Sequence, residues 1–261
     1  MRILIVSATA LEIAPLVTRL EPSPLVVRQP VLSELVLRQA QDERVEGAHR
    51  ERESLTLSSS KGERVAAYSH RGHDIDVLVT GVGMVATAAW TARTLADSLY
   101  GLALNLGVCG SFDAAFAPGS VVHVVSDRMT ELGAEDGESF LTIRELGLLE
   151  DDAVPFSQGR LVNARPPANA ALHTLPSVHG VTVNTVHGND RSIADIAHRF
   201  ALQIESMEGA GFMYACLIHE IPFAQVRAVS NMVERRNRAA WKMTEAIAGL
   251  ERAALDILEC L

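Results

Sequence analysis

The chain carries the sequence ESMEGA at residues 205–210 and the sequence VRAVSN at residues 226–231. The first stretch places Glu208 at the start of an apolar helix, and the second is an apolar strand that leads to Asn231. A carboxylate at such a helix start can accept hydrogen bonds from two adjacent hydroxyls, as on a ribose, while Met207 can lie against the apolar face of the sugar. The two stretches therefore predict an α/β fold with a nucleoside-type site.

Outside these stretches, apolar runs of strand length alternate with helical patterns. The predicted strands cover residues 2–7, 76–80, 101–106, 120–126, 181–186 and 223–229. The predicted helices cover residues 85–99, 190–200, 209–218 and 239–261. This alternation predicts one α/β domain over residues 1–261, with three αβα layers around a central mixed sheet.

Residues 27–64 do not follow this alternation. They are charged, polar and poor in aromatic residues, and they end in a Ser-rich run. Surface loops accept extra length at a small entropic cost of closure. We therefore expect a charged surface insertion here, without a functional role.

Composition limits the classes of function. With 261 residues, 48% of them hydrophobic, the chain can bury a sizeable core, and its formal net charge of −9 argues against a nucleic-acid-binding surface. The three cysteines lack metal-type spacing, and the apolar run at residues 3–6 is too short for a signal sequence or a membrane span. We expect a cytoplasmic protein that acts on a small molecule, with no metal, nucleic-acid or membrane partner.

A first candidate catalytic residue lies in the sequence MRILIVSATALE at residues 1–12. A strand runs into a short loop, and Glu12 follows at the opening of a helix. This is the edge at which an open α/β sheet binds ligands, so Glu12 can serve as a general base. The alternative is structural, because an acidic residue in a first helical turn also interacts favourably with the helix dipole.

Two further turns follow predicted strands and are rich in small residues. The sequence TGVG at residues 80–83 brings backbone amides and the Thr80 hydroxyl close to a small polar guest, or it simply makes a tight turn. The sequence NLGVCGSF at residues 105–112 is a second such loop. Its Cys109 has no basic neighbour in sequence, so packing is the favoured role over nucleophilic chemistry.

Four motifs in chain order, at residues 1–12, 80–83, 105–112 and the pair 205–210 with 226–231, resemble the nucleoside phosphorylase and nucleosidase superfamily. The resemblance covers nearly the whole chain apart from residues 27–64. The resemblance implies a nucleoside phosphorylase-like fold, cleavage of an N-glycosidic bond without a cofactor, and a homodimer. It implies that Glu12 activates the attacking water and that Glu208 orients the ribose. The other substrate contacts it implies are Thr80, Gly83, Met207, Cys109 and Gly110.

Asn105 indicates which nucleophile attacks. Hexameric phosphorylases carry an arginine here that grips phosphate, whereas this chain has asparagine, and Glu12 should repel phosphate. We therefore expect hydrolysis. Arg227 lies inside an apolar strand and needs a carboxylate or ligand partner, with structural pairing the favoured role.

Asn231 is expected to choose the base. Relatives that cleave adenosine derivatives carry aspartate at this position. An asparagine amide can donate hydrogen bonds to both N7 and O6 of a 6-oxopurine, whereas 6-aminopurine would set one NH2 against another. The alternative is that Asn231 caps the loop after the strand. The stacking residue stays open, with Phe156 and His187 as weak candidates.

The basic loop at residues 234–241 narrows the resemblance further. Its sequence ERRNRAAW, after RAVSN, resembles the futalosine hydrolases of the alternative menaquinone pathway, whose inosine-like substrate carries a carboxyphenyl group beyond the 5′ carbon. Arg235 and Arg238, or Arg236 between them, can supply a cation for that carboxylate. The expected reaction is release of hypoxanthine from futalosine. Open alternatives are a methylthioadenosine/adenosylhomocysteine nucleosidase, a purine nucleoside phosphorylase and a catalytically silent nucleoside-binding protein.

Overall fold

Strand β1 (Arg2–Ser7) illustrates how the sheet is built, because its apolar side chains alternate between two faces. In the computed structural model, which describes residues 1–23 and 64–261, Ile3 and Ile5 pack in one buried cluster and Leu4 and Val6 in another. A strand that is buried on both faces lies inside a sheet covered by helices on both sides. The surface insertion expected at residues 27–64 falls, apart from its last residue, outside the described residues.

One large mixed sheet contains most of the strands. Besides β1 they are β2 (Glu21–Pro22), β3 (Val65–His70), β4 (His73–Val79), β5 (Leu102–Ser111), β6 (Val121–Asp127), β9 (Phe156–Ser157), β10 (Arg160–Val162), β11 (Ser177–Thr182), β12 (Ile204–Ser206) and β13 (Phe223–Met232). A separate hairpin joins β7 (Gly133–Asp136) and β8 (Ser139–Thr142).

Strand β5 is the centre of this sheet. It runs parallel to β1 and β13, and β1 runs parallel to β4, so the carboxyl ends of these four strands meet at one edge. Strand β5 also pairs with β12. From β12 the pairing continues to β11, then to β6 and then to β13, which itself pairs with β5. Five strands thus close a small ring around their own buried cluster, a feature that the sequence analysis did not predict.

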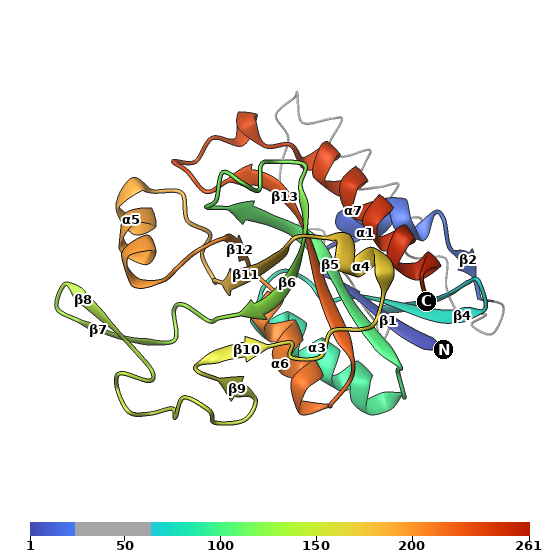
Figure 1. Ribbon diagram of the computed structural model, residues 1–261, viewed down its shortest axis with the longest axis horizontal. Coiled ribbons are helices and arrows are strands. Elements are labelled where there is room, and N and C mark those ends of the chain that lie inside the picture. Colours follow the sequence, from blue (N-terminus) through green and yellow to red (C-terminus); the bar gives the residue numbers. More distant parts are fainter. Residues whose placement is uncertain (24–63) are drawn as a thin grey trace, which may run out of the picture.

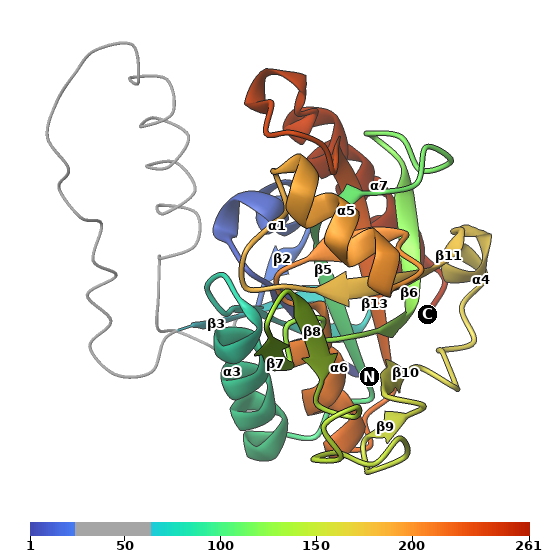
Figure 2. The same ribbon diagram turned by 90° about the vertical axis from the view of Figure 1, so that its left-hand side faces the viewer.

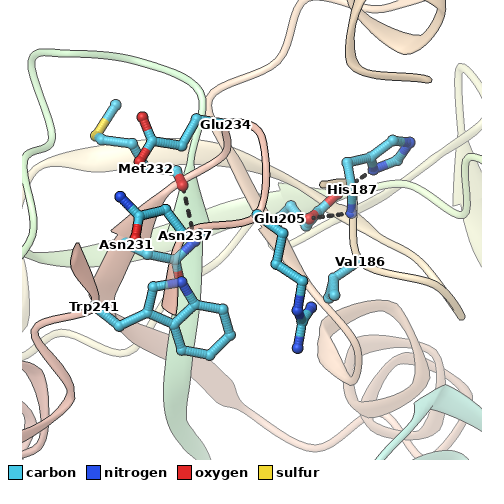
Figure 3. A pocket seen from close by; sticks show the side chains of 10 residues that line it. Val186, His187, Glu205, Asn231, Met232, Glu234, Asn237 and Trp241 are labelled. Atoms are coloured by element: carbon cyan, nitrogen blue, oxygen red, sulfur yellow. Dashed lines mark hydrogen bonds and ion pairs between the residues drawn. The ribbon is translucent and has the colours of Figure 1, made fainter. Parts of the chain in front are cut away.

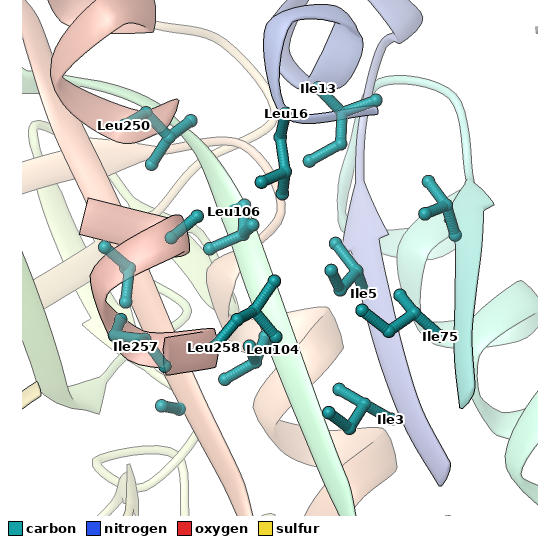
Figure 4. Packing of buried hydrophobic residues seen from close by; sticks show 14 of the residues in the cluster. Ile3, Ile5, Ile13, Leu16, Ile75, Leu104, Leu106, Leu250, Ile257 and Leu258 are labelled. Atoms are coloured by element: carbon teal, nitrogen blue, oxygen red, sulfur yellow. The ribbon is translucent and has the colours of Figure 1, made fainter. Parts of the chain in front are cut away.

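Helices cover the sheet on both faces, which confirms the predicted three-layer α/β fold (Figures 1 and 2). They are α1 (Ala10–Val17), α3 (Met84–Asp97), α4 (Ala170–Thr174), α5 (Asp190–Arg199), α6 (Gly209–Ile218) and α7 (Met243–Glu259). Helices α1 and α7 pack on one face, where Leu16 and Leu250 meet Leu104 and other sheet residues (Figure 4). Helices α3 and α6 pack on the opposite face. None of these helices has the length and hydropathy needed to cross a bilayer.

Several predicted boundaries were wrong, and three of them have a clear physical reason. The strand predicted at residues 181–186 is β11, which ends at Thr182 because the chain then turns and the Asn184 backbone N–H bonds the Glu131 carboxylate instead. The strand predicted at residues 101–106 continues to Ser111, since β12 and β13 pair with this segment. The last helix begins at Met243 rather than residue 239, because the Lys242 N–H bonds the Ser230 carbonyl before the helix starts.

Candidate active site

The candidate catalytic residues lie where the turns after β1, β4, β5 and β12 meet. Glu12 follows β1 in the first turn of α1, Gly83 precedes α3, and Glu208 lies between β12 and α6. Strand β5 passes beneath them. This is the edge of the sheet at which the sequence analysis expected a ligand.

Glu12 is only 9% exposed and its carboxylate points back toward the sheet. One oxygen, Oε2, accepts hydrogen bonds from the backbone N–H of Thr9 at 2.9 Å and from its hydroxyl at 2.8 Å. The other, Oε1, accepts one from the Val108 N–H at 3.0 Å. Glu12 therefore forms a capping box with Thr9, a structural role beyond the helix-dipole interaction considered from sequence, and Oε1 keeps a lone pair that can take a proton from water.

Glu208 is held between a backbone amide and a guanidinium. Its Oε1 accepts a hydrogen bond from the Gly83 N–H at 3.0 Å, and its Oε2 lies 3.6 Å from Nη1 of Arg227. Gly83 has a φ of +103°, a left-handed backbone conformation that favours glycine. Met207, next to Glu208, is half-buried. The resemblance placed these three residues around a sugar, and the structure brings two of them into direct contact.

Arg227 is 1% exposed and is the largest fully buried side chain of the described residues. Besides Glu208, its guanidinium donates to the Asn105 side-chain carbonyl, while the Asn105 amide donates to the Val6 carbonyl at 3.0 Å. The expected carboxylate pairing is confirmed. Although residue 105 is asparagine, the site does contain an arginine, because Asn105 anchors Arg227 of β13.

Glu12, Glu208 and Arg227 form one electrostatic unit, which we call the carboxylate cluster. Burial raises the pKa of Glu208, Arg227 and the Gly83 N–H lower it, and the negative charge of Glu12 raises it. At Gly107 a Cβ atom would lie 2.3 Å from Nη1 of Arg227 and 3.1 Å from Oε1 of Glu12. The guanidinium and the Glu12 carboxylate thus crowd around a residue without a side chain, and Glu208 lies on the guanidinium. Two carboxylates against one guanidinium favour a neutral water over phosphate.

Two predicted substrate contacts, Thr80 and Cys109, have side chains that are buried against other parts of the protein. The Thr80 hydroxyl is buried and donates to the Gly81 carbonyl at 2.8 Å, with Thr87 at 3.1 Å. Cys109 is buried among apolar residues of the ring, and burial raises the pKa of its thiol to about 12. Its expected packing role is confirmed, and a nucleophilic role does not fit such a thiol.

Asn231 belongs to β13, not to a loop after it, because a bulge at Ser230 shifts the register and sets Asn231 opposite Gly110. Its Oδ1 accepts a hydrogen bond from the Ser230 hydroxyl at 2.8 Å, and its Nδ2 donates to the Met232 carbonyl at 2.9 Å. These partners fix the orientation of the amide. One amide hydrogen therefore stays free, not the two that the sequence argument required.

A cavity opens over Gly110 and Asn231, and we call it the Asn231 cavity. Figure 3 shows Asn231 and Trp241 on one side of it and Val186 and His187 on the other. It is lined by Gly110, Val186, His187, Glu205, Asn231, Met232, Glu234, Arg236, Asn237 and Trp241. Glu205 and His187 both line it and are hydrogen-bonded to each other. The His187 backbone N–H donates to Oε1 of Glu205 at 3.0 Å, and the His187 Nδ1–H donates to Oε2.

The basic loop contributes a different arginine from the two that were favoured. Arg236 lines the Asn231 cavity, and its guanidinium carbon lies 5.6 Å from the centre of the Trp241 ring. Arg235 and Arg238 are exposed and do not line this cavity. The stacking candidate Phe156 was wrong, since its ring packs edge-on against Tyr214 in the core beneath α6. The other candidate, His187, does reach the cavity.

Glu205 and Trp241 were not assigned to the site from sequence, and Arg236 was named only as one of three candidate arginines. A charged residue between Ile204 and Ser206, in a short buried strand, was the available signal for Glu205. No comparable signal separated Arg236 from its neighbours. Within residues 1–23 and 64–261, no group of His, Cys, Asp and Glu side chains is arranged to hold a metal ion.

Comparison with known proteins identifies relatives of this site. A sequence model of the phosphorylase superfamily matches residues 34–261. A futalosine hydrolase of Streptomyces coelicolor is 37% identical over 184 residues, which cover 68% of this chain and 76% of the relative.

Two solved structures show the same fold. One is a 5′-methylthioadenosine/S-adenosylhomocysteine nucleosidase of Colwellia psychrerythraea in complex with adenine, with a TM-score of 0.71 and 19% identity over 100% of this chain and 96% of the other. The second is a futalosine hydrolase of Helicobacter pylori, with a TM-score of 0.70 and 11% identity over 100% and 98%. The superfamily resemblance drawn from the four motifs is thus confirmed.

Proposed function

The chain belongs to the phosphorylase superfamily and, within it, to the futalosine hydrolases, and from this we propose that it hydrolyses the N-glycosidic bond of futalosine. The products are hypoxanthine and dehypoxanthine futalosine, in menaquinone biosynthesis. The enzyme is an N-glycosyl hydrolase whose substrate is a small nucleoside.

One observation carries this proposal: β5 joins the two parts of the site. The Val108 N–H holds Glu12 of the carboxylate cluster, and Gly110, two residues further along the strand, lines the Asn231 cavity. Two residues of a strand span about 7 Å. A nucleoside whose base fills the cavity over Gly110 can therefore place its sugar beside Glu12 and Glu208.

The reaction that this geometry supports is dissociative. The bond between C1′ and N9 breaks and its electron pair leaves with the purine, to which Asn231 donates a hydrogen bond through its free N–H. The sugar becomes oxocarbenium-like, with Glu208 accepting from its hydroxyls. Water then adds to C1′ while Oε1 of Glu12 takes its proton. The purine anion takes up a proton from solvent to become hypoxanthine, and Glu12 returns its proton to solvent, so one water is consumed. Arg227 balances the charge of Glu208 so that both carboxylates can lie in one buried place.

The test is chromatography of the purified protein incubated with futalosine, 5′-methylthioadenosine and inosine, each with and without phosphate. We expect hypoxanthine from futalosine at a rate that phosphate does not change. Adenine released from 5′-methylthioadenosine as the main activity would overturn the assignment of the base. Strict dependence on phosphate would overturn that of the nucleophile.

We further propose a homodimer formed through α3 and α6. These helices lie side by side on one face of the sheet, and their exposed apolar residues include Val85 at 77% and Ile218 at 49% exposure. Exposed apolar residues on neighbouring helices are typical of subunit interfaces. Light scattering behind size-exclusion chromatography measures the mass, and replacing Val85 with Glu should shift a dimer toward monomer.

We place the enzyme in the cytoplasm. Its three cysteines are free, two of them buried and Cys260 exposed, which fits a reducing compartment. Fractionation of the source cells tests this location.

A further inference from the structure

Three neighbouring strands align their side chains in one row across the floor of the Asn231 cavity. In the antiparallel pairing of β12 with β5, Glu205 lies opposite Gly110, and in the parallel pairing of β13 with β5, Asn231 lies opposite the same Gly110. Strands are about 4.8 Å apart, so Glu205 and Asn231 stand on either side of Gly110 with a gap between their side chains. The Val233 side chain borders this gap, since a Cβ at Gly110 would lie 2.8 Å from its Cγ2. A Cβ at Gly110 would lie 3.3 Å from Nδ2 of Asn231 and would narrow this gap.

Asn231 alone distinguishes hypoxanthine from adenine poorly. One hydrogen of its amide is engaged by the Met232 carbonyl, and the free N–H can bind N7, which accepts hydrogen bonds in both bases. The two bases differ sharply at N1, on the opposite side of the ring. N1 carries a hydrogen and donates in hypoxanthine, whereas it accepts in adenine. A site that selects hypoxanthine therefore needs an acceptor across the gap from Asn231.

Glu205 is placed and prepared to be that acceptor. It is 3% exposed, and His187 holds both of its oxygens, one through the backbone N–H and one through Nδ1–H. Each carboxylate oxygen still keeps a lone pair. The His187 ring is itself fixed by edge-on contact with Phe112, at 6.2 Å between ring centres. A buried carboxylate held on two sides offers its remaining lone pairs in fixed directions.

We propose that Glu205 reads the base, accepting the N1–H of a 6-oxopurine while Asn231 donates to its N7 edge, and that His187 is the positioning residue for Glu205. This inference rests on the proposed function and adds to it the contact that excludes 6-aminopurines. A carboxylate facing the N1 lone pair of adenine would leave two acceptors opposed in a buried site, which is unfavourable.

The experiment compares the wild-type enzyme with Glu205→Gln, which keeps the shape and can turn its NH2 toward N1. The measurements are kcat/KM for futalosine and the inhibition constants of hypoxanthine and adenine. We expect kcat/KM to fall about 10- to 100-fold, since a hydrogen bond to a charged group is lost. We expect the preference for hypoxanthine over adenine to fall by a similar factor or to reverse. An unchanged preference would overturn the proposal, whatever happens to kcat/KM.

Matched variants separate recognition from folding. Glu138→Gln, exposed in the turn between β7 and β8, should change none of these values. His187→Ala should weaken the hypoxanthine preference and lower the melting temperature, because Glu205 loses a buried hydrogen bond. His187→Asn, whose amide can donate near the position of Nδ1, should restore part of both. A His187→Ala enzyme with wild-type preference would overturn the positioning role.

The outcomes also separate this inference from the proposed function. If wild-type enzyme releases hypoxanthine from futalosine but Glu205→Gln keeps the wild-type preference, only the role of Glu205 fails. If the wild-type enzyme cleaves 5′-methylthioadenosine instead and binds adenine more tightly than hypoxanthine, the proposed function fails as well.

Discussion

The carboxylate cluster meets β5 at Val108, and the Asn231 cavity meets it at Gly110, two residues further along. The two regions are nevertheless built in different ways. The cluster is buried and held by backbone amides, since Val108 of β5 holds Glu12 and Gly83, in the turn before α3, holds Glu208. The cavity is built from side chains of distant segments, and the loop that borders it, with Arg236, is exposed. The part that performs the chemistry is thus rigid, while the part that recognises substrate is open to variation.

Removing the general base should have the largest effect. For Glu12→Gln we expect kcat for hypoxanthine release to fall by roughly 10²–10⁴, because the water loses the group that takes its proton. Glutamine also completes a capping box with Thr9, so the melting temperature should stay close to that of the wild type. An unchanged kcat would remove Glu12 from the mechanism and leave only its capping role.

The ion pair between Arg227 and Glu208 should contribute to the stability of the folded protein. Arg227→Met leaves Glu208 buried without its cation, so we expect the free energy of unfolding in urea to fall by about 3–5 kcal/mol. The exposed ion pair of Arg19 and Glu251, at 3.1 Å, provides the control. Arg19→Met should lower the free energy of unfolding by less than about 1 kcal/mol. Equal losses in the two variants would show that the cluster is not a buried electrostatic unit.

The different construction of the carboxylate cluster and the Asn231 cavity also explains which site residues could be predicted from sequence. Glu12, Gly83 and Glu208 lie in short motifs at strand and helix ends, where local pattern shows both structure and role. Glu205 and His187 come together only through the pairing of β12 with β5 and the turn after β11. The ring of five strands was missed for the same reason, since it depends on pairings between segments far apart in the chain.

Asp127 is a buried carboxyl group whose hydrogen bonds lead to the start of the helix that follows Glu208. It is fully buried and accepts hydrogen bonds from Gln225 of β13 at 3.1 Å and from Thr182 at 2.8 Å. The Thr182 hydroxyl in turn accepts the N–H of Ala210, in the turn that carries Glu208. Burial raises the pKa of Asp127 from 3.8 to about 6.

This raised pKa predicts a pH dependence of stability. Between pH 4 and 6 the folded protein keeps a proton on Asp127 that the unfolded chain has lost, so the carboxyl group's contribution to stability falls as pH rises through this range. Asp127→Asn carries no charge at any pH. The free energy of unfolding of the wild type minus that of the variant should therefore decrease by about 2 kcal/mol from pH 4 to pH 7. A pH-independent difference would contradict the raised pKa.

The smallest effect is expected at the exposed border of the cavity. Arg236 lies over Trp241 and faces the cavity, so it is placed to meet the carboxylate of futalosine. Because the pair would be solvent-exposed, Arg236→Ala should raise KM about two- to fivefold with little change in kcat, and added salt should reduce the difference. Arg235→Ala and Arg238→Ala are the matched controls and should leave KM unchanged. A larger effect from either control would return the role to the residues first favoured from sequence, and would mean that the loop rearranges when substrate binds.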